Sequence, residues 1–137
     1  MLENCLRSIG AQEVPEGWRY RAIVVENSET AESRDLALRI AEETGLSMDY
    51  AIEPERGIPQ VRNRSLSLAL ERRADWIAFI DDDEIADPGW LEAYCRAADA
   101  YDAEIMRGPV VLDYPPETPD WLPKRSKAVG ETGKPRP

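Results

Sequence analysis

Short apolar runs typical of β-strands alternate with segments of helical periodicity along most of this chain, and the alternation limits the folds available to it. The helices are predicted at residues 2–9, 30–44, 59–72 and 87–98, and the strands at residues 19–26, 48–52, 76–80 and 105–112. Strands that alternate with helices form mostly parallel sheets with helices on both faces. The pattern therefore predicts a three-layer, Rossmann-like α/β domain over residues 1–125, followed by a flexible tail at residues 126–137.

The net charge of the chain limits the classes of ligand that it can bind. The 137 residues include 27 acidic and 17 basic side chains, which gives a net charge of −10. Non-specific binding to nucleic acid or anionic lipid needs a basic surface, so we expect no nucleic-acid partner. An acidic chain that binds an anionic ligand needs a local device, such as a divalent cation or a helix N-terminus.

The chain contains no histidine, which excludes Ser-His and Cys-His catalytic units and histidine-based zinc sites. Cys5 and Cys95 fall on apolar helical faces and are expected to be buried thiols in a reducing compartment. The sequence has no apolar run of about 18 residues and no signal-peptide pattern at its N-terminus. We therefore expect a cytoplasmic protein, either free or peripheral at the inner membrane face.

The third predicted strand ends abruptly in four consecutive carboxylates, Asp81–Glu84. Adjacent carboxylates repel one another unless something neutralises them, and hard divalent cations prefer oxygen ligands of this kind. Residues i and i+2 of a strand point the same way, so Asp81 and Asp83 are expected to converge on one metal or ligand while Asp82 points elsewhere. The alternative is a solvated acidic turn in which Asp87 caps the next helix.

Polar residues also follow the first two predicted strands. Glu26–Ser28 comes after the first, and the loop at residues 53–56 comes after the second. Ligands of parallel sheets bind beyond the carboxyl ends of the strands. Since the acidic segment Asp81–Glu84 follows the third strand, the rule directs attention to these three segments as parts of one site.

Four segments, in order, resemble motifs of the family 2 glycosyltransferases, which carry the GT-A fold. They are Leu2–Ile9 with Gln12 (L..CL.SI..Q), Ile23–Ser28 (IVVDNxS), Glu53–Arg64 (G...ARN.G) and Ile77–Glu84 (hhFhDxDD/E). Farther along, residues 108–110 and 119–122 resemble a GPV…P.W stretch of many bacterial members. Each motif alone has low specificity, but the ordered set covers nearly the whole chain.

The resemblance implies an inverting transferase that moves a sugar from a nucleotide-diphosphate donor, a UDP-sugar, to an acceptor hydroxyl. Asp83, with Asp81, is expected to bind Mn²⁺ or Mg²⁺, which stabilises the leaving nucleotide as a Lewis acid. The implied nucleotide-binding residues are Glu26, Asn27, Arg62, Asp81 and Asp82. Glu26 stands where the family usually has an aspartate that reads the nucleobase. Arg62 lies near the start of a helix, where backbone N–H groups favour anions.

Two segments of the family pattern have no counterpart in this sequence. The family's first strand should precede Leu2, and its catalytic base lies in an acceptor-binding half downstream of the metal motif. We therefore expect no catalytic residue in this chain and no sugar transfer by it alone, since a base must reach the acceptor hydroxyl. The first strand should lie between the strands at residues 19–26 and 76–80. Those two strands then pair directly, accept another segment, or expose edges that promote self-association.

Two other functions fit parts of the sequence. One is a non-catalytic module that binds nucleotide or acts only by association, which a nucleotide titration beside a turnover assay would distinguish. The other is a phosphatase of the haloacid dehalogenase type, whose DxDx(T/V) motif is approached by Asp81–Ile85. Trapping of a phosphoaspartate would identify that activity, although the later lysine and GDxxxD elements of the class find no match here.

Overall fold

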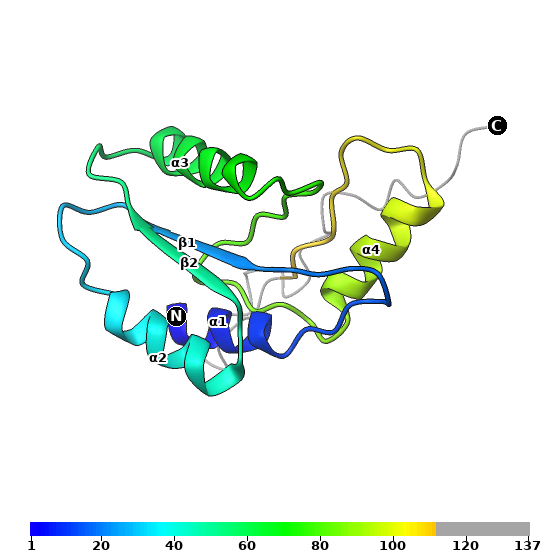
Figure 1. Cartoon of the computed structure of the whole chain (residues 1–137), viewed down its shortest axis with the longest axis horizontal. Helices are drawn as coiled ribbons and strands as arrows, with labels where there is room; N and C mark the ends of the chain where they lie inside the picture. The colour runs from blue at the N-terminus through cyan, green and yellow to red at the C-terminus, as the bar shows by residue number, and fades with distance from the viewer. Residues whose placement is uncertain (112–137) are drawn as a thin grey trace, which may run out of the picture. The chain divides into compact units, whose positions relative to one another are not determined.

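The computed structural model describes residues 1–111. The chain forms two compact units, Met1–Tyr101 and Asp102–Pro137. The first unit contains, in order, α1 (Leu2–Gly10), β1 (Ala22–Glu26), α2 (Arg34–Thr44), β2 (Met48–Ile52), α3 (Ile58–Glu71) and α4 (Trp90–Ala100) (Figure 1). The described residues of the second unit, 102–111, contain neither helix nor strand. The predicted tail at residues 126–137 lies outside the described residues.

The two strands form a parallel sheet in which Ala22 pairs with Met48 and Glu26 pairs with Ile52. Helix α2 makes the crossover between them, and the strands are bordered by α1 and α2 on one side and by α3 on the other (Figure 1). Parallel strands joined through a helix place both carboxyl ends at the same edge. The predicted three-layer, Rossmann-like α/β fold is confirmed, with a smaller sheet than expected.

The main core lies between the sheet and the helices α1 and α2. Leu6 of α1 and Ala37 and Ile40 of α2 are buried and pack against Val24 of β1 and Tyr50 of β2. Helix α2 ends as the sequence predicts, at Gly45 in the left-handed conformation (φ 71°). A glycine in that conformation is a common end of a helix because it carries no Cβ.

A second, smaller cluster connects distant parts of the chain. Ile9, Leu46 and Ala86 are buried together, and Ile80 and Trp90 pack against them. This cluster attaches the acidic segment and the start of α4 to the end of α1. Both cysteines are buried free thiols, as predicted.

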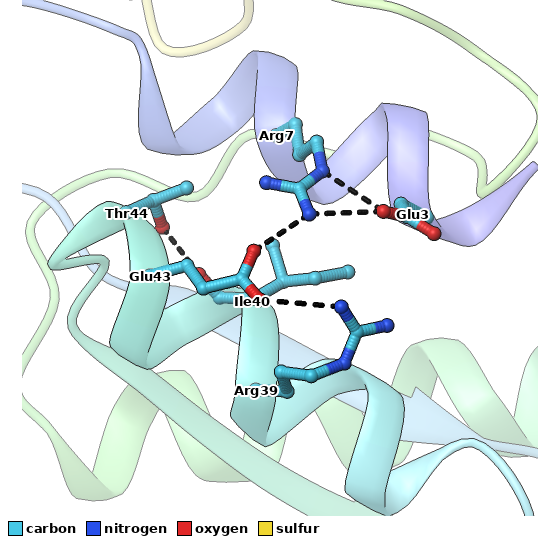
Figure 2. Close-up of polar contacts among 6 residues, drawn as sticks. All are labelled: Glu3, Arg7, Arg39, Ile40, Glu43 and Thr44. Atoms are coloured by element: carbon cyan, nitrogen blue, oxygen red, sulfur yellow. Dashed lines mark hydrogen bonds and ion pairs between the residues drawn. The ribbon is translucent and has the colours of Figure 1, made fainter.

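Figure 2 shows the outer contact between α1 and α2. Arg7 of α1 binds Glu3 on its own helix at 2.9 Å and Glu43 of α2 at 2.6 Å, and Arg39 also reaches Glu43 at 3.2 Å. Exposed ion pairs of this kind contribute little, with a usual limit of about 1 kcal/mol. The close approach of the helices depends more on Gly10, where a Cβ would lie 2.7 Å from the Cβ of Thr44.

Two predicted strands are wrong. Residues 76–80 and residues 105–111 form no strand, while Leu112 lies outside the described residues. Trp76 is 39% exposed and Phe79 45% exposed, although this segment is the most apolar predicted strand. Within the described residues β1 pairs with β2 alone, so it does not close directly on residues 76–80. A strand needs a partner for its N–H and C=O groups, and an apolar composition does not supply one.

Several element boundaries also differ from the predictions. Strand β1 begins at Ala22 rather than at residue 19, and α2 begins at Arg34 rather than near residue 30. Helix α4 begins at Trp90, after the left-handed Gly89 (φ 81°), rather than at Asp87. The Trp90 N–H reaches the Asp87 carbonyl at 3.0 Å, so Asp87 belongs to a turn that precedes the helix.

Candidate functional site

A cavity of about 400 Å³ lies beside the carboxyl end of β1 and the first turn of α3. Its walls are formed by Asn27, Ile58, Val61, Arg62, Asp81, Asp82 and Asp83. Five of the six residues predicted for the site therefore gather around one cavity. The sixth, Glu26, does not line it.

The acidic segment is a closed turn rather than a continuation of a strand. The Glu84 N–H donates to the Asp81 carbonyl at 3.1 Å, and the Asp81 N–H donates to the Glu84 carboxylate at 3.0 Å. Asp82 and Asp83 occupy the turn between them. The expectation that Asp82 points away from the site is wrong, because strand alternation does not apply to residues in a turn.

The turn carries a concentrated negative charge that reaches a neighbouring thiol. Cys5 of α1 lies 3.5 Å from the Asp81 carbonyl oxygen. Burial raises the pKa of Cys5 to about 11, and the charges of Asp82, Glu84, Asp83 and Asp81 add to this effect. Both effects disfavour the thiolate, so Cys5 stays a neutral thiol at neutral pH.

Arg62 is the cation that α3 already places beside the turn. Its guanidinium donates to a carboxylate oxygen of Asp81 at 2.6 Å. The same group lies over the Phe79 ring, with Cζ 4.5 Å from the ring centroid. Cation–π contact and ion pairing together fix the side chain at the wall of the cavity. The Asp81 side chain is 63% exposed, so the pair is accessible to a competing ligand.

Asn27 connects the end of β1 to the loop that follows β2. Its Nδ2 donates to the carbonyls of Glu53 and Glu55, each at 2.8 Å. Its Oδ1 accepts the Gly57 N–H at 2.9 Å. Asn27 therefore makes three hydrogen bonds to the backbone of one loop while it also lines the cavity.

The carboxylate of Glu26 turns away from the cavity toward the approach to α2. It accepts hydrogen bonds from the hydroxyls of Ser28 and Tyr50 and from the N–H groups of Glu32 and Ser33. Burial alone would raise the pKa of Glu26, but these hydrogen bonds lower it below its ordinary value. In return, burial and the Glu26 carboxylate raise the pKa of Tyr50 to about 12.

Comparison with known proteins then decides the family. The family described as "Glycosyl transferase family 2" matches residues 1–136. The chain belongs to glycosyl transferase family 2. It is also 33% identical over 121 residues to the "Succinoglycan biosynthesis protein ExoM" of Rhizobium meliloti (strain 1021). No solved structure shows a significant match to the chain.

The alignment with ExoM covers 88% of this family 2 chain but 38% of that relative, so the chain spans well under half of the relative's length. Membership in the family disagrees with the alternative interpretation as a phosphatase of the haloacid dehalogenase type. Within the described residues, no helix has the length and apolar character needed to cross a bilayer.

The side-chain donor atoms of the acidic turn are carboxylate oxygens. In residues 1–111 no three acidic or cysteine side chains come close enough together to hold a metal ion. Mg²⁺ in proteins is usually bound by one or two carboxylates, several waters and substrate phosphates. The carboxylates of the acidic turn match this type of ligand in their donor chemistry.

Two apolar residues of the cavity wall, Ile58 and Val61, and the Phe79 ring under Arg62 were not predicted as parts of the site. Ile58 is 76% exposed at the first position of α3. The sequence did offer one signal for Ile58. Pro59 marks the start of a helix, and a large apolar residue at such a start is exposed and free to line a site.

Replacing Glu26 with glutamine is expected to lower the free energy of unfolding by about 1–2 kcal/mol, because charge-assisted hydrogen bonds weaken. The pKa of Glu26 is lower in the folded state than in the unfolded state. Its contribution to the free energy of unfolding is therefore complete above the unfolded-state pKa and is lost as the pH falls through the folded-state pKa. Urea titrations of parent and variant at several pH values measure the difference. Glu29→Gln, an exposed change in the following turn, is the control. Equal stabilities at neutral pH would contradict the prediction.

Proposed function

We propose that this chain is the nucleotide-sugar-binding portion of an inverting glycosyltransferase. It would bind a nucleotide-diphosphate sugar, a UDP-sugar, for transfer to an acceptor hydroxyl. The observation that carries the proposal is the gathering of Arg62, Asn27 and three carboxylates around one cavity at the carboxyl edge of a parallel sheet, in a chain of family 2. That edge is where open α/β sheets bind their ligands.

Charge explains why a metal belongs to the proposal. The cavity wall carries three carboxylates and one guanidinium, so a diphosphate would meet net repulsion there. Asp83, with Asp81, would hold Mn²⁺ or Mg²⁺, and the bound cation would supply a Lewis acid for the departing nucleoside diphosphate. Arg62, displaced from Asp81 or shared with it, would bind the phosphate oxygens. The relative's role in succinoglycan biosynthesis is consistent with sugar transfer.

Calorimetric titration tests the proposal. UDP and GDP are titrated into the chain with and without Mn²⁺, and uridine serves as a probe that lacks phosphate. We expect UDP to bind measurably when Mn²⁺ is present and at least about tenfold more weakly without it, a difference of about 1.4 kcal/mol. Equal binding with and without the metal, or no binding of either nucleotide, would overturn it.

A second candidate function, a module that acts by association, is favoured by the open side of β1. The Ala22 N–H donates to the Ser47 carbonyl, and the Glu26 carbonyl accepts the Glu53 N–H, so both residues face β2. In a parallel pair the alternate residues, Ile23 and Val25, present their N–H and C=O groups on the opposite edge. No partner for these groups is found among residues 1–111. A strand edge that has no partner within this part of the chain is a template for pairing with a second chain.

We expect the chain to self-associate through residues 76–80 and this edge. Light scattering over a range of concentrations should show a mass that rises above that of the monomer. Ile77→Lys places a charge in the exposed apolar segment and should lower the associated fraction severalfold. Leu70→Lys, on the 70% exposed Leu70 of α3, is the matched control. A monomer at every concentration, with strong hydrogen-exchange protection at Ile23 and Val25, would contradict self-association.

A further inference from the structure

Asn27 lines the cavity, yet its carboxamide is largely committed to the protein itself. An asparagine amide offers two N–H donors and one carbonyl acceptor. Both donors are used on the carbonyls of Glu53 and Glu55, and the oxygen accepts the Gly57 N–H. Little hydrogen-bonding capacity remains for a ligand. The side chain is therefore suited to hold the loop rather than to read a nucleotide.

The loop that Asn27 holds runs from the end of β2 to the start of α3. Its first residue still belongs to the ladder, since the Glu53 N–H donates to the Glu26 carbonyl at 2.8 Å. Its last residue, Gly57, precedes α3 with φ 144°, and a Cβ there would collide with Oε1 of Gln60. No side chain of α3 caps this end of the helix. The Gly57 N–H has the Asn27 oxygen as its partner instead.

The position of this loop sets where α3 begins. The first turn of α3 contributes Ile58, Val61 and Arg62 to the cavity, and Arg62 reaches Asp81 from there. A shift of about 1 Å in a group that positions a ligand is enough to weaken its action strongly. Loss of the three hydrogen bonds would free the loop and with it the helix end that carries Arg62.

We infer that Asn27 is a positioning residue of the cavity, which acts on a bound nucleotide through the loop at residues 53–57 and Arg62. This inference rests on the proposed nucleotide-binding function. It assigns the contact with phosphate to Arg62 and the placement of Arg62 to Asn27. The two neighbouring side chains at the end of β1 thus hold different segments. Glu26 binds the segment that precedes α2, and Asn27 binds the loop that precedes α3.

The test uses Asn27→Asp, which keeps one acceptor for the Gly57 N–H but presents an oxygen to two carbonyls. Asn63→Asp, the same change at an exposed position of α3, is the matched control. Hydrogen exchange at the Gly57 amide is measured without nucleotide, and UDP affinity is measured with Mn²⁺. We expect Gly57 exchange to accelerate about tenfold or more in Asn27→Asp and to stay unchanged in the control.

A double-mutant cycle with Arg62→Gln separates positioning from direct contact. If Asn27 acts through Arg62, the double variant binds UDP no more than about twofold more weakly than Arg62→Gln alone. If the losses of UDP affinity in the two single variants multiply in the double variant, the residues act independently and the inference is overturned. So would a parent Gly57 amide that exchanges as fast as an unprotected one, a result that needs no variant to fold. Failure of the parent to bind UDP would instead overturn the proposed function.

Discussion

Replacing Ile40 with alanine is expected to lower the free energy of unfolding by about 2–5 kcal/mol, the usual cost of emptying a fully buried aliphatic site. Ile40 is 0% exposed and is the largest fully buried side chain of the described residues. Ile40 packs with Leu6 of α1 and against residues of the sheet, so its truncation would leave a cavity between these elements. Domains are stable by about 5–15 kcal/mol, so this one change can remove much of the total.

Urea unfolding followed by circular dichroism measures the loss. Leu38→Ala is the matched control, because Leu38 lies on the same helix, loses the same number of carbons and is 45% exposed. The control should cost clearly less than Ile40→Ala. If the alanine variant does not fold, Ile40→Val should still lose about 0.5–1.5 kcal/mol. Equal losses at the two positions would show that the core does not depend on Ile40.

Asp83→Asn is expected to weaken Mn²⁺-dependent UDP binding at least about tenfold, equivalent to about 1.4 kcal/mol. The reason is that an amide oxygen carries no charge and neutralises a divalent cation less well than a carboxylate does. The variant should be no less stable than the parent without metal, because one of four neighbouring negative charges is removed. A loss of binding combined with retained stability would distinguish a ligand role from a structural role.

The control for Asp83→Asn is Asp75→Asn, the same change at an exposed position that does not line the cavity. Calorimetry with Mn²⁺ and UDP measures binding, and thermal melting measures stability. Unchanged affinity in Asp83→Asn would remove Asp83 from the proposed metal site. A comparable loss in Asp75→Asn would show that net charge, and not the acidic turn, governs binding.

The helices were predictable because apolar residues recur at the spacing that places them on the one face of the helix that is buried. Leu6 and Ile9 of α1 occupy buried positions of their helical pattern, and Pro59 and Gly45 mark a helix start and a helix end as expected. The segment at residues 76–80 was not predictable in the same way. Its apolar composition expresses a preference for extended structure, but a strand also needs a neighbour, which composition does not reveal.

The site followed from topology more than from composition. The rule that ligands bind at the carboxyl ends of parallel strands correctly directed attention to Asn27, which follows β1. For the acidic turn the rule relied on a third strand at residues 76–80, which does not form. The orientation of Glu26 was not accessible, since it depends on Tyr50, 24 residues away, and on the backbone of residues 32 and 33. The hydrogen bonds of Asn27 were hidden for the same reason, because their partners are carbonyls and an amide of a distant loop.

The two core clusters imply an order of assembly during synthesis. Every residue of the first cluster lies between Leu2 and Tyr50, whereas the second also requires Ile80, Ala86 and Trp90. At about 5–20 residues per second, roughly 2–8 s separate the emergence of β2 from that of α4. The βαβ half can therefore settle while the acidic turn is still being made. The cavity is therefore completed last, when the acidic turn docks onto the βαβ half that has already folded.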